Sequence, residues 1–120
     1  MIDVRHGVPV WHVPAHGPEL ATEQDAADLV GATFGRGADV IVVPVERFPA
    51  RFFDMRAKLI GHFFSKIVQY RFRLVVLGDV RRHVEASTVF RDVVRESNRG
   101  KDVWFVTDLA ELDTRLAAGR

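Results

Sequence analysis

Three short runs of apolar residues stand out because no polar side chain interrupts them, at positions 40–43, 74–77 and 103–106. Such runs are typical of strands buried on both faces, as in a parallel sheet covered by helices on each side. A further strand is expected over 8–13, and Pro9 places it nearer an edge because proline lacks the N–H that a ladder needs. Residues 2–5 are expected to pair with this strand through a turn at His6 and Gly7.

Between the strands, apolar residues recur at the three- and four-residue spacing of helices. Thr22 and Asp25 resemble a capping box at the start of the first helix, and Gly35 and Gly37 are placed to stop it. The predicted helices cover 23–34, 49–72, 84–96 and a last segment that begins near 108 and frays over 117–120.

Alternation of strands and helices predicts right-handed parallel crossovers. We therefore expect a single α/β domain over residues 1–120, with a mainly parallel sheet of four to five strands flanked by helices. The chain has 120 residues, of which 48% are hydrophobic and 28% charged, and this composition fits one globular domain with a substantial core. Collagen-like, coiled-coil and disordered classes are excluded by the same composition.

Charge and cysteine content narrow the function classes. The absence of cysteine excludes zinc ribbons, iron–sulfur sites, thiol catalysis and a disulfide framework. With 17 basic and 16 acidic residues the net charge is +1, so we expect neither nucleic acid nor membrane as a partner. The first residues do not form a basic stretch followed by an apolar one, which leads us to expect a cytoplasmic location.

No pattern of reactive residues predicts catalysis. His12 and His16 are four residues apart, but Pro14 prevents the helix that would place both on one face, and no third ligand is evident. Ser87 and Thr88 lie in a helical segment without a neighbouring pair of histidine and acid. We therefore predict no catalytic residue, no metal and no cofactor.

The predicted long helix over 49–72 has two adjacent apolar rows and only one narrow polar row. One face of a sheet covers about half of such a helix. The rest is covered by a neighbouring helix of the same domain or forms a self-association surface, and the sequence leaves both possibilities open. The candidates for an interaction surface are Phe52, Phe53, Phe63 and Phe64.

Charged residues follow the predicted strands at their carboxyl ends, where open α/β sheets bind ligands. Because guanidinium groups bind anions with two hydrogen bonds, a site there would suit an anionic ligand. The candidates are Arg47, Asp54, Arg56 and Asp79. In the alternative reading, Asp79 caps the following helix or turn and Arg56 pairs with an acid, without any ligand.

Several motifs in the second half of the chain resemble one family. They are Phe52-Phe53-Asp54-Met55-Arg56, Tyr70-Arg71, Gly78-Asp79 and the segment 91–100. With these motifs the chain resembles a bacterial family known as domain of unknown function 4180. The resemblance spans most of the chain, and it implies no activity.

The order of the predicted elements is also similar to that of STAS domains, the sulfate-transporter and anti-sigma-factor-antagonist modules. In the antagonists, a serine at the start of the helix after the second parallel strand is phosphorylated to release a partner. The corresponding stretch here, 50–54, has no hydroxyl, so this switch does not carry over.

Two functions follow from these patterns. The first is a non-catalytic, STAS-like regulatory module that binds another protein or forms a homodimer. The alternative is a protein or enzyme that binds a small anionic ligand at the carboxyl ends of the strands.

Overall fold

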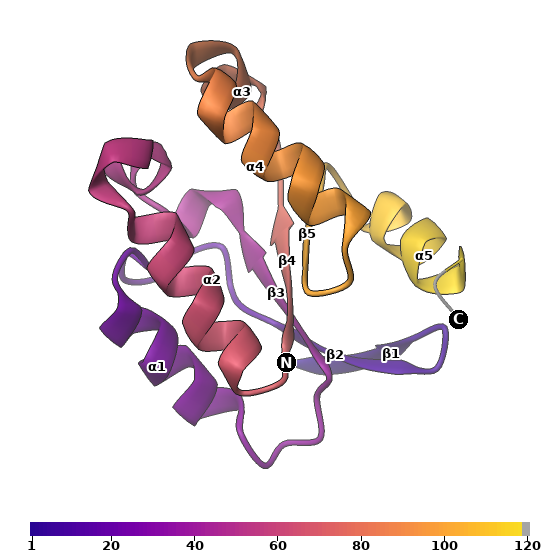
Figure 1. Cartoon of the computed structure of the whole chain (residues 1–120). Coiled ribbons are helices and arrows are strands. Elements are labelled where there is room, and N and C mark those ends of the chain that lie inside the picture. Colours follow the sequence, from indigo (N-terminus) through magenta and orange to yellow (C-terminus); the bar gives the residue numbers. More distant parts are fainter. Residues whose placement is uncertain (119–120) are drawn as a thin grey trace.

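A computed structural model describes residues 1–118 and shows one five-stranded sheet with helices packed on it (Figure 1). Positions 119 and 120, the end of the predicted domain and of its fraying last helix, lie outside the described residues. The strands are β1 (Ile2–Arg5), β2 (Val8–His12), β3 (Val40–Pro44), β4 (Arg73–Leu77) and β5 (Val103–Val106). The α-helices are α1 (Glu23–Thr33), α2 (Leu59–Gln69), α3 (Arg81–Ala86), α4 (Thr88–Arg99) and α5 (Leu109–Ala118). Within residues 1–118, no helix combines the length and apolar content needed to cross a bilayer.

The strands lie in chain order across the sheet, β1-β2-β3-β4-β5, which confirms the predicted α/β class. β1 and β2 form the predicted antiparallel hairpin, and all other neighbours are parallel. β2 is second from the edge. Its Pro9 loses no ladder bond, because parallel pairing with β3 begins one residue later, where Val10 lies opposite Val40.

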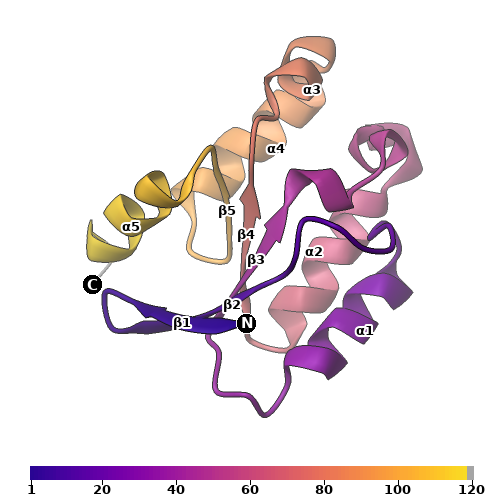
Figure 2. The same ribbon diagram turned by 180° about the vertical axis from the view of Figure 1, so that it is seen from behind.

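The two faces of the sheet are covered unequally. Right-handed crossovers between strands in sequential order place α1, α2 and α4 on one face. Ile41 and Leu74 belong to the core on that side, together with Phe63 of α2. The opposite face packs against α5, whose Leu112 and Leu116 are buried there. The helices α2 and α4 accordingly lie in front of the strands in Figure 1 and behind them in Figure 2.

Side-chain caps set the ends of two helices. The predicted capping box is confirmed: Thr22 Oγ1 accepts the Asp25 N–H at 3.1 Å, and Asp25 Oδ2 accepts the Thr22 N–H at 3.0 Å. The single helix predicted over 84–96 is wrong, since the chain forms α3 and α4 there. Ser87 is extended, and its hydroxyl accepts the Phe90 N–H at 3.1 Å, so a new helix begins at this residue.

The long helix predicted over 49–72 is wrong in its first half. Only α2 is α-helical, and the preceding residues form two short 3-10 helices, Ala50–Phe53 and Met55–Ala57. Between them, the Asp54 side chain accepts the Arg56 N–H at 3.0 Å, and Lys58 then adopts a left-handed conformation with φ of 60°. Both features interrupt an α-helical ladder.

The phenylalanines predicted as a surface belong mainly to the core, which corrects that prediction. Phe52 and Phe63 are fully buried and Phe53 is 6% exposed, whereas Phe64 is only partly buried. Phe48 joins this cluster, since its ring stacks on Phe52 with the centroids 4.3 Å apart. The apolar residues before α2 therefore fold back onto its first turns. They cover the apolar surface that the sequence analysis had offered to a partner.

We expect Phe52→Ala to lower the free energy of unfolding by about 3–5 kcal/mol, because a fully buried ring is replaced by a cavity. Phe34→Ala is the control: Phe34 is 69% exposed, so the change should stay within about 0.5 kcal/mol. Urea denaturation of both variants measures the difference. Equal, small effects would contradict the assignment of Phe52 to the core.

Candidate functional site

A cavity of about 460 Å³ lies beyond the carboxyl ends of the strands, between the 3-10 segment and the α3–α4 turn. Among the predicted site residues, Asp54 and Arg56 line it; Arg47 and Asp79 do not. His83, which the sequence did not single out, and Ser87, which it offered no partner for catalysis, complete its polar wall. The structure therefore brings together half of the predicted ligand site.

His83 offers a neutral imidazole to this cavity. Its ring stacks on Phe53 with the centroids 3.9 Å apart and 14° between the planes. Burial lowers the pKa of His83, and the neighbouring charge of Arg82 lowers it further. In the sequence it is one of five histidines with no informative spacing, so no signal pointed to it. Within residues 1–118, no group of three or more His, Asp or Glu side chains is placed to hold a metal ion.

Asp54 and Arg56 are bound to each other. Asp54 Oδ1 accepts the backbone N–H of Arg56 at 3.0 Å and its Nε–H at 3.1 Å. The hydrogen bonds from the Arg56 side chain and backbone hold the pKa of Asp54 below its usual value. The carboxylate therefore stays ionised and engaged near neutral pH, which does not suit a general acid or base.

Asp79 forms the same arrangement with Arg81, away from the cavity. Its Oδ1 accepts the Arg81 backbone N–H at 2.9 Å and the Nε–H at 3.1 Å. The side-chain hydrogen bond from Arg81 is the main cause that lowers the pKa of Asp79 to about 2. The geometry corresponds to the alternative reading of the sequence, in which Asp79 caps a turn.

Arg47 joins two loops. Its side chain is almost fully buried and donates to the carbonyl oxygens of Pro18, at 3.0 Å from Nε, and Pro14, at 2.9 Å from Nη1. A Cβ atom at Gly17 would lie 2.7 Å from the Arg47 guanidinium carbon, so only glycine allows this close approach. Arg47 therefore holds the 14–18 loop in place and presents no free guanidinium to a ligand.

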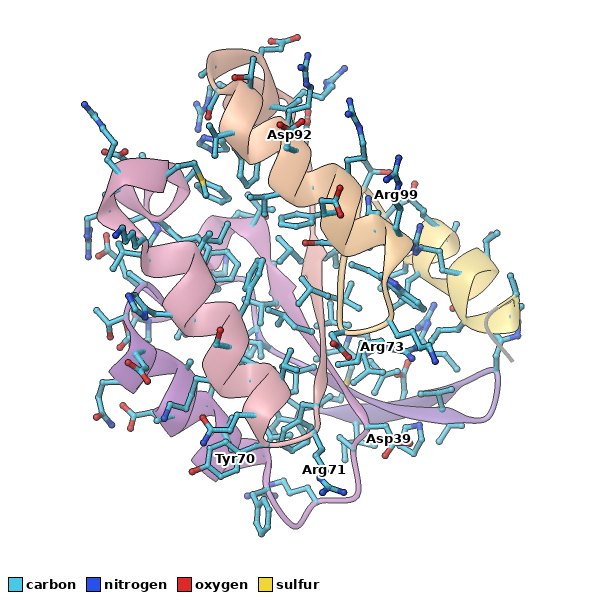
Figure 3. All side chains as sticks on the ribbon, viewed as in Figure 1. Asp39, Tyr70, Arg71, Arg73, Asp92 and Arg99 are labelled. Atoms are coloured by element: carbon cyan, nitrogen blue, oxygen red, sulfur yellow. The ribbon has the colours of Figure 1, made fainter. Side chains whose placement is uncertain are left out.

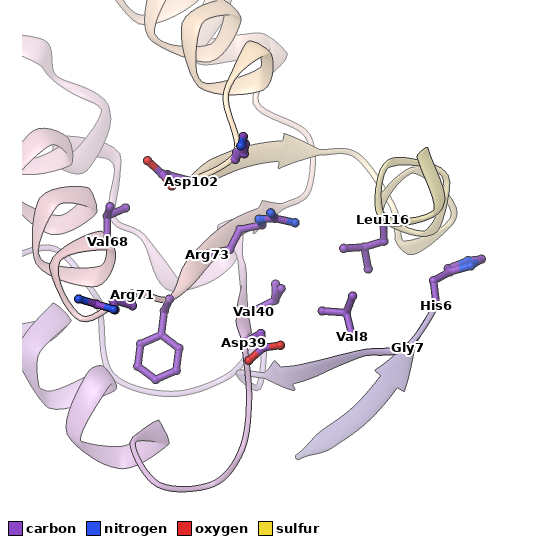
Figure 4. Close-up of a pocket in the computed structure, with 12 residues that line it drawn as sticks. His6, Gly7, Val8, Asp39, Val40, Val68, Arg71, Arg73, Asp102 and Leu116 are labelled. Atoms are coloured by element: carbon purple, nitrogen blue, oxygen red, sulfur yellow. The ribbon is translucent and has the colours of Figure 1, made fainter. Parts of the chain in front are cut away.

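A larger cavity, of about 800 Å³, lies at the opposite end of the sheet (Figure 4). It is bounded by the β1–β2 turn, the end of α2 and the residues that begin β3, β4 and β5. Its charged lining residues include Arg71, Arg73, Lys101, Asp39 and Asp102. From the sequence we predicted ligand sites only at the carboxyl ends of the strands. That prediction missed this cavity, which lies at their amino ends.

We expect Arg47→Ala to destabilise the fold by about 2 kcal/mol or more, because two carbonyl groups lose a charged donor. Arg51→Ala, which removes the exposed ion pair with Glu19 and a weaker attraction to Asp25, should cost less than about 1 kcal/mol. Denaturant midpoints of both variants are compared. An Arg47→Ala protein as stable as Arg51→Ala would show that the loop does not depend on this clamp.

Arg81→Gln should raise the pKa of Asp79 from about 2 toward its ordinary value, about 3.9, since the strongest lowering interaction is lost. Carboxyl carbon chemical shifts followed by NMR between acidic and neutral pH measure this pKa. Arg82→Gln removes the next charge along the chain and should leave it low. An unchanged pKa in Arg81→Gln would contradict the pairing.

No match was found among curated proteins or among solved structures. A family model described as "Domain of unknown function (DUF4180)" matches residues 5–116, from the end of β1 into α5. This match includes the motifs that the sequence shares with the family and nearly all of the elements described above. The chain therefore belongs to the DUF4180 family of domains of unknown function.

Proposed function

We propose that this domain is a non-catalytic, STAS-like interaction module of the cytoplasm that works by self-association through β1. Its antiparallel strand pair followed by alternating helices and parallel strands is compatible with a STAS-like arrangement, although 3-10 segments replace the first half of the expected long helix and two helices replace the next one. A protein surface, rather than nucleic acid or membrane, fits its near-neutral charge. The observation that carries the proposal is the open edge of the sheet at β1.

The backbone of β1 is free to pair on its outer side. Residue pairs in an antiparallel ladder alternate between hydrogen-bonded and non-bonded. The His12 N–H donates to the Met1 carbonyl at 2.7 Å, so Ile2 and Val4 belong to the non-bonded pairs with β2. Their own N–H and C=O groups therefore point toward the open edge, where another strand can add.

Apolar and charged side chains alternate along β1, with Ile2 and Val4 on its exposed face, whereas the other edge of the sheet is partly blocked. Val4 is 65% exposed and Ile2 is 37% exposed. At β5, by contrast, the Asn98 side chain from α4 accepts the Phe105 N–H at 2.8 Å and occupies the strand edge. Because folded proteins usually block free edges, an open and apolar one favours an interface.

A second copy of the chain fits this edge. Asp3 and Arg5 flank Val4 and form an ion pair of 3.0 Å within one chain, where Arg5 also binds Asp113 and Asp3 also binds His12. Antiparallel pairing centred on Val4 would place Asp3 of each copy opposite Arg5 of the other, with the two Val4 residues adjacent. Opposite charges and branched apolar side chains in cross-strand pairs both stabilise such a ladder. The arrangement is self-complementary, as a two-fold symmetric dimer requires.

The anionic-ligand alternative at the carboxyl ends has less support. Asp54 and Asp79 are engaged by the arginines two residues away, and Arg47 donates to loop carbonyls. The groups predicted to hold a ligand there thus already have partners within the chain.

Val4→Lys should weaken dimerisation at least tenfold, because each dimer would hold two adjacent lysines at its centre. Val89→Lys is the matched control, since Val89 is 57% exposed on α4 and lies outside β1. Sedimentation equilibrium over a range of concentrations measures both variants and the unmodified protein. A protein that stays monomeric at millimolar concentration, or equal dimerisation in all three, would refute the proposal.

A further inference from the structure

Arg71 occupies a backbone position that favours glycine. After α2, the Arg71 N–H donates to the Val68 carbonyl at 2.8 Å and the Phe72 N–H to the Ile67 carbonyl at 3.4 Å. This pair of bonds is the Schellman ending of a helix, in which the first residue beyond the cap is left-handed and usually glycine. Arg71 adopts it with φ of 66° and lies next to Tyr70 at the end of α2 in Figure 3. Strained backbone positions of this kind concentrate at functional sites, so the Arg71 side chain is a candidate for a functional role.

The cations around the amino-end cavity lack acidic partners. No carboxylate lies within 4.0 Å of Arg71, Arg73 or Lys101 among residues 1–118, although Asp39 and Asp102 line the same cavity. Elsewhere in residues 1–118 some basic residues form ion pairs, as Arg5 and Arg81 do, and others such as Arg82 and Arg91 form none, so what distinguishes the three cations here is that they line one cavity. The three cavity cations thus keep unused capacity to bind an anion.

Arg73 is held in place without using its donors on a protein acceptor. Its guanidinium carbon lies 4.4 Å from the centroid of the Trp104 ring, a cation–π contact that fixes the side chain. Arg73 is the first residue of β4, and Lys101 comes shortly before β5, the neighbouring strand. These two cations therefore belong to adjacent strand starts.

The cavity has a cation on each side and apolar residues between them. In Figure 4, Arg71 lies beside Val68 on one side of the opening, whereas Arg73 points toward Leu116 on the other. Val40 and other apolar side chains line the space between them. Cations on two sides of a partly apolar space suit a carbon skeleton with an anionic group at each end better than a single phosphate ion.

We propose that the amino-end cavity binds a small organic dianion, with one carboxylate or phosphate group at Arg71 and the other at Arg73 and Lys101. The three cations assigned to the ligand lie outside β1, so their variants test this site separately from the proposed dimer, although His6 of the β1–β2 turn lines the cavity beside the dimer edge. The carboxylates of Asp39 and Asp102 repel the ligand's anionic groups and lower its affinity. Removing the charge of Asp39 should therefore tighten binding, whereas removing a cation should weaken it.

Isothermal titration calorimetry on the full chain tests the ligand class with three probes. Adipate carries a carboxylate at each end of a six-carbon chain, hexanoate carries one, and hexamethylene bisphosphonate carries two phosphonates. Adipate or the bisphosphonate should bind at least tenfold more tightly than hexanoate, and the tighter of the two identifies the oxyanion. Equal binding of hexanoate and both dianions, or no binding of any, overturns the proposal.

Arg71→Gly separates function from folding. Glycine adopts a positive φ freely, so the midpoint of thermal unfolding should stay the same or rise, while affinity for the better dianion falls about tenfold. Lys101→Gln should also weaken binding, and Asp39→Asn should tighten it. Arg91→Gln is the control for charge alone, because Arg91 is exposed on α4 and does not line the cavity. Undiminished binding by Arg71→Gly, or an equal loss in Arg91→Gln, would refute the assignment.

Discussion

The chain order of the parallel strands constrains the rest of this fold. Right-handed connections send every crossover helix to one face, so the other face depends on α5 and the β1–β2 hairpin. Arg5 of β1 donates to Asp113 of α5 at 2.7 Å, which ties hairpin and helix together. On the same face, Trp104 lies between the guanidinium groups of Arg73 and Arg115, 4.4 and 4.6 Å from its centroid. The terminal elements thus cover a face that the crossovers leave open.

Strand positions were predictable from the sequence, whereas the hydrogen-bonding pattern before α2 was not. An uninterrupted apolar run has few alternatives to a buried strand. Helical spacing over 49–72 placed Phe52 and Phe63 in apolar rows and led us to offer them as an interaction surface, whereas both are fully buried. The spacing of apolar residues indicates which side chains share a face. It does not distinguish an α-helix from two 3-10 helices that bury the same side chains. The interruption depends on the Asp54 side chain and the left-handed Lys58, and an exposed lysine carries no signal for a positive φ.

At the candidate site, too, contacts between residues close in sequence were predictable, whereas contacts between distant residues were not. Asp54 with Arg56 and Asp79 with Arg81 share one spacing and one set of hydrogen bonds, in which an aspartate accepts from the backbone and Nε of the arginine two residues later. This local turn was visible in the sequence. The carbonyl partners of Arg47, by contrast, lie 29 and 33 residues away, and only the folded chain brings them together.

Among the places where the chain departs from local rules of stability, two carry the proposals made above. The edge strand β1 exposes Val4 where a lysine or a covering side chain would protect it, as Asn98 protects β5. Arg71 takes a conformation that glycine adopts more easily. Departures of this kind are expected where function opposes stability. One departure exposes backbone donors and acceptors and the other a guanidinium group, so they fit different ligands: a strand and an anion.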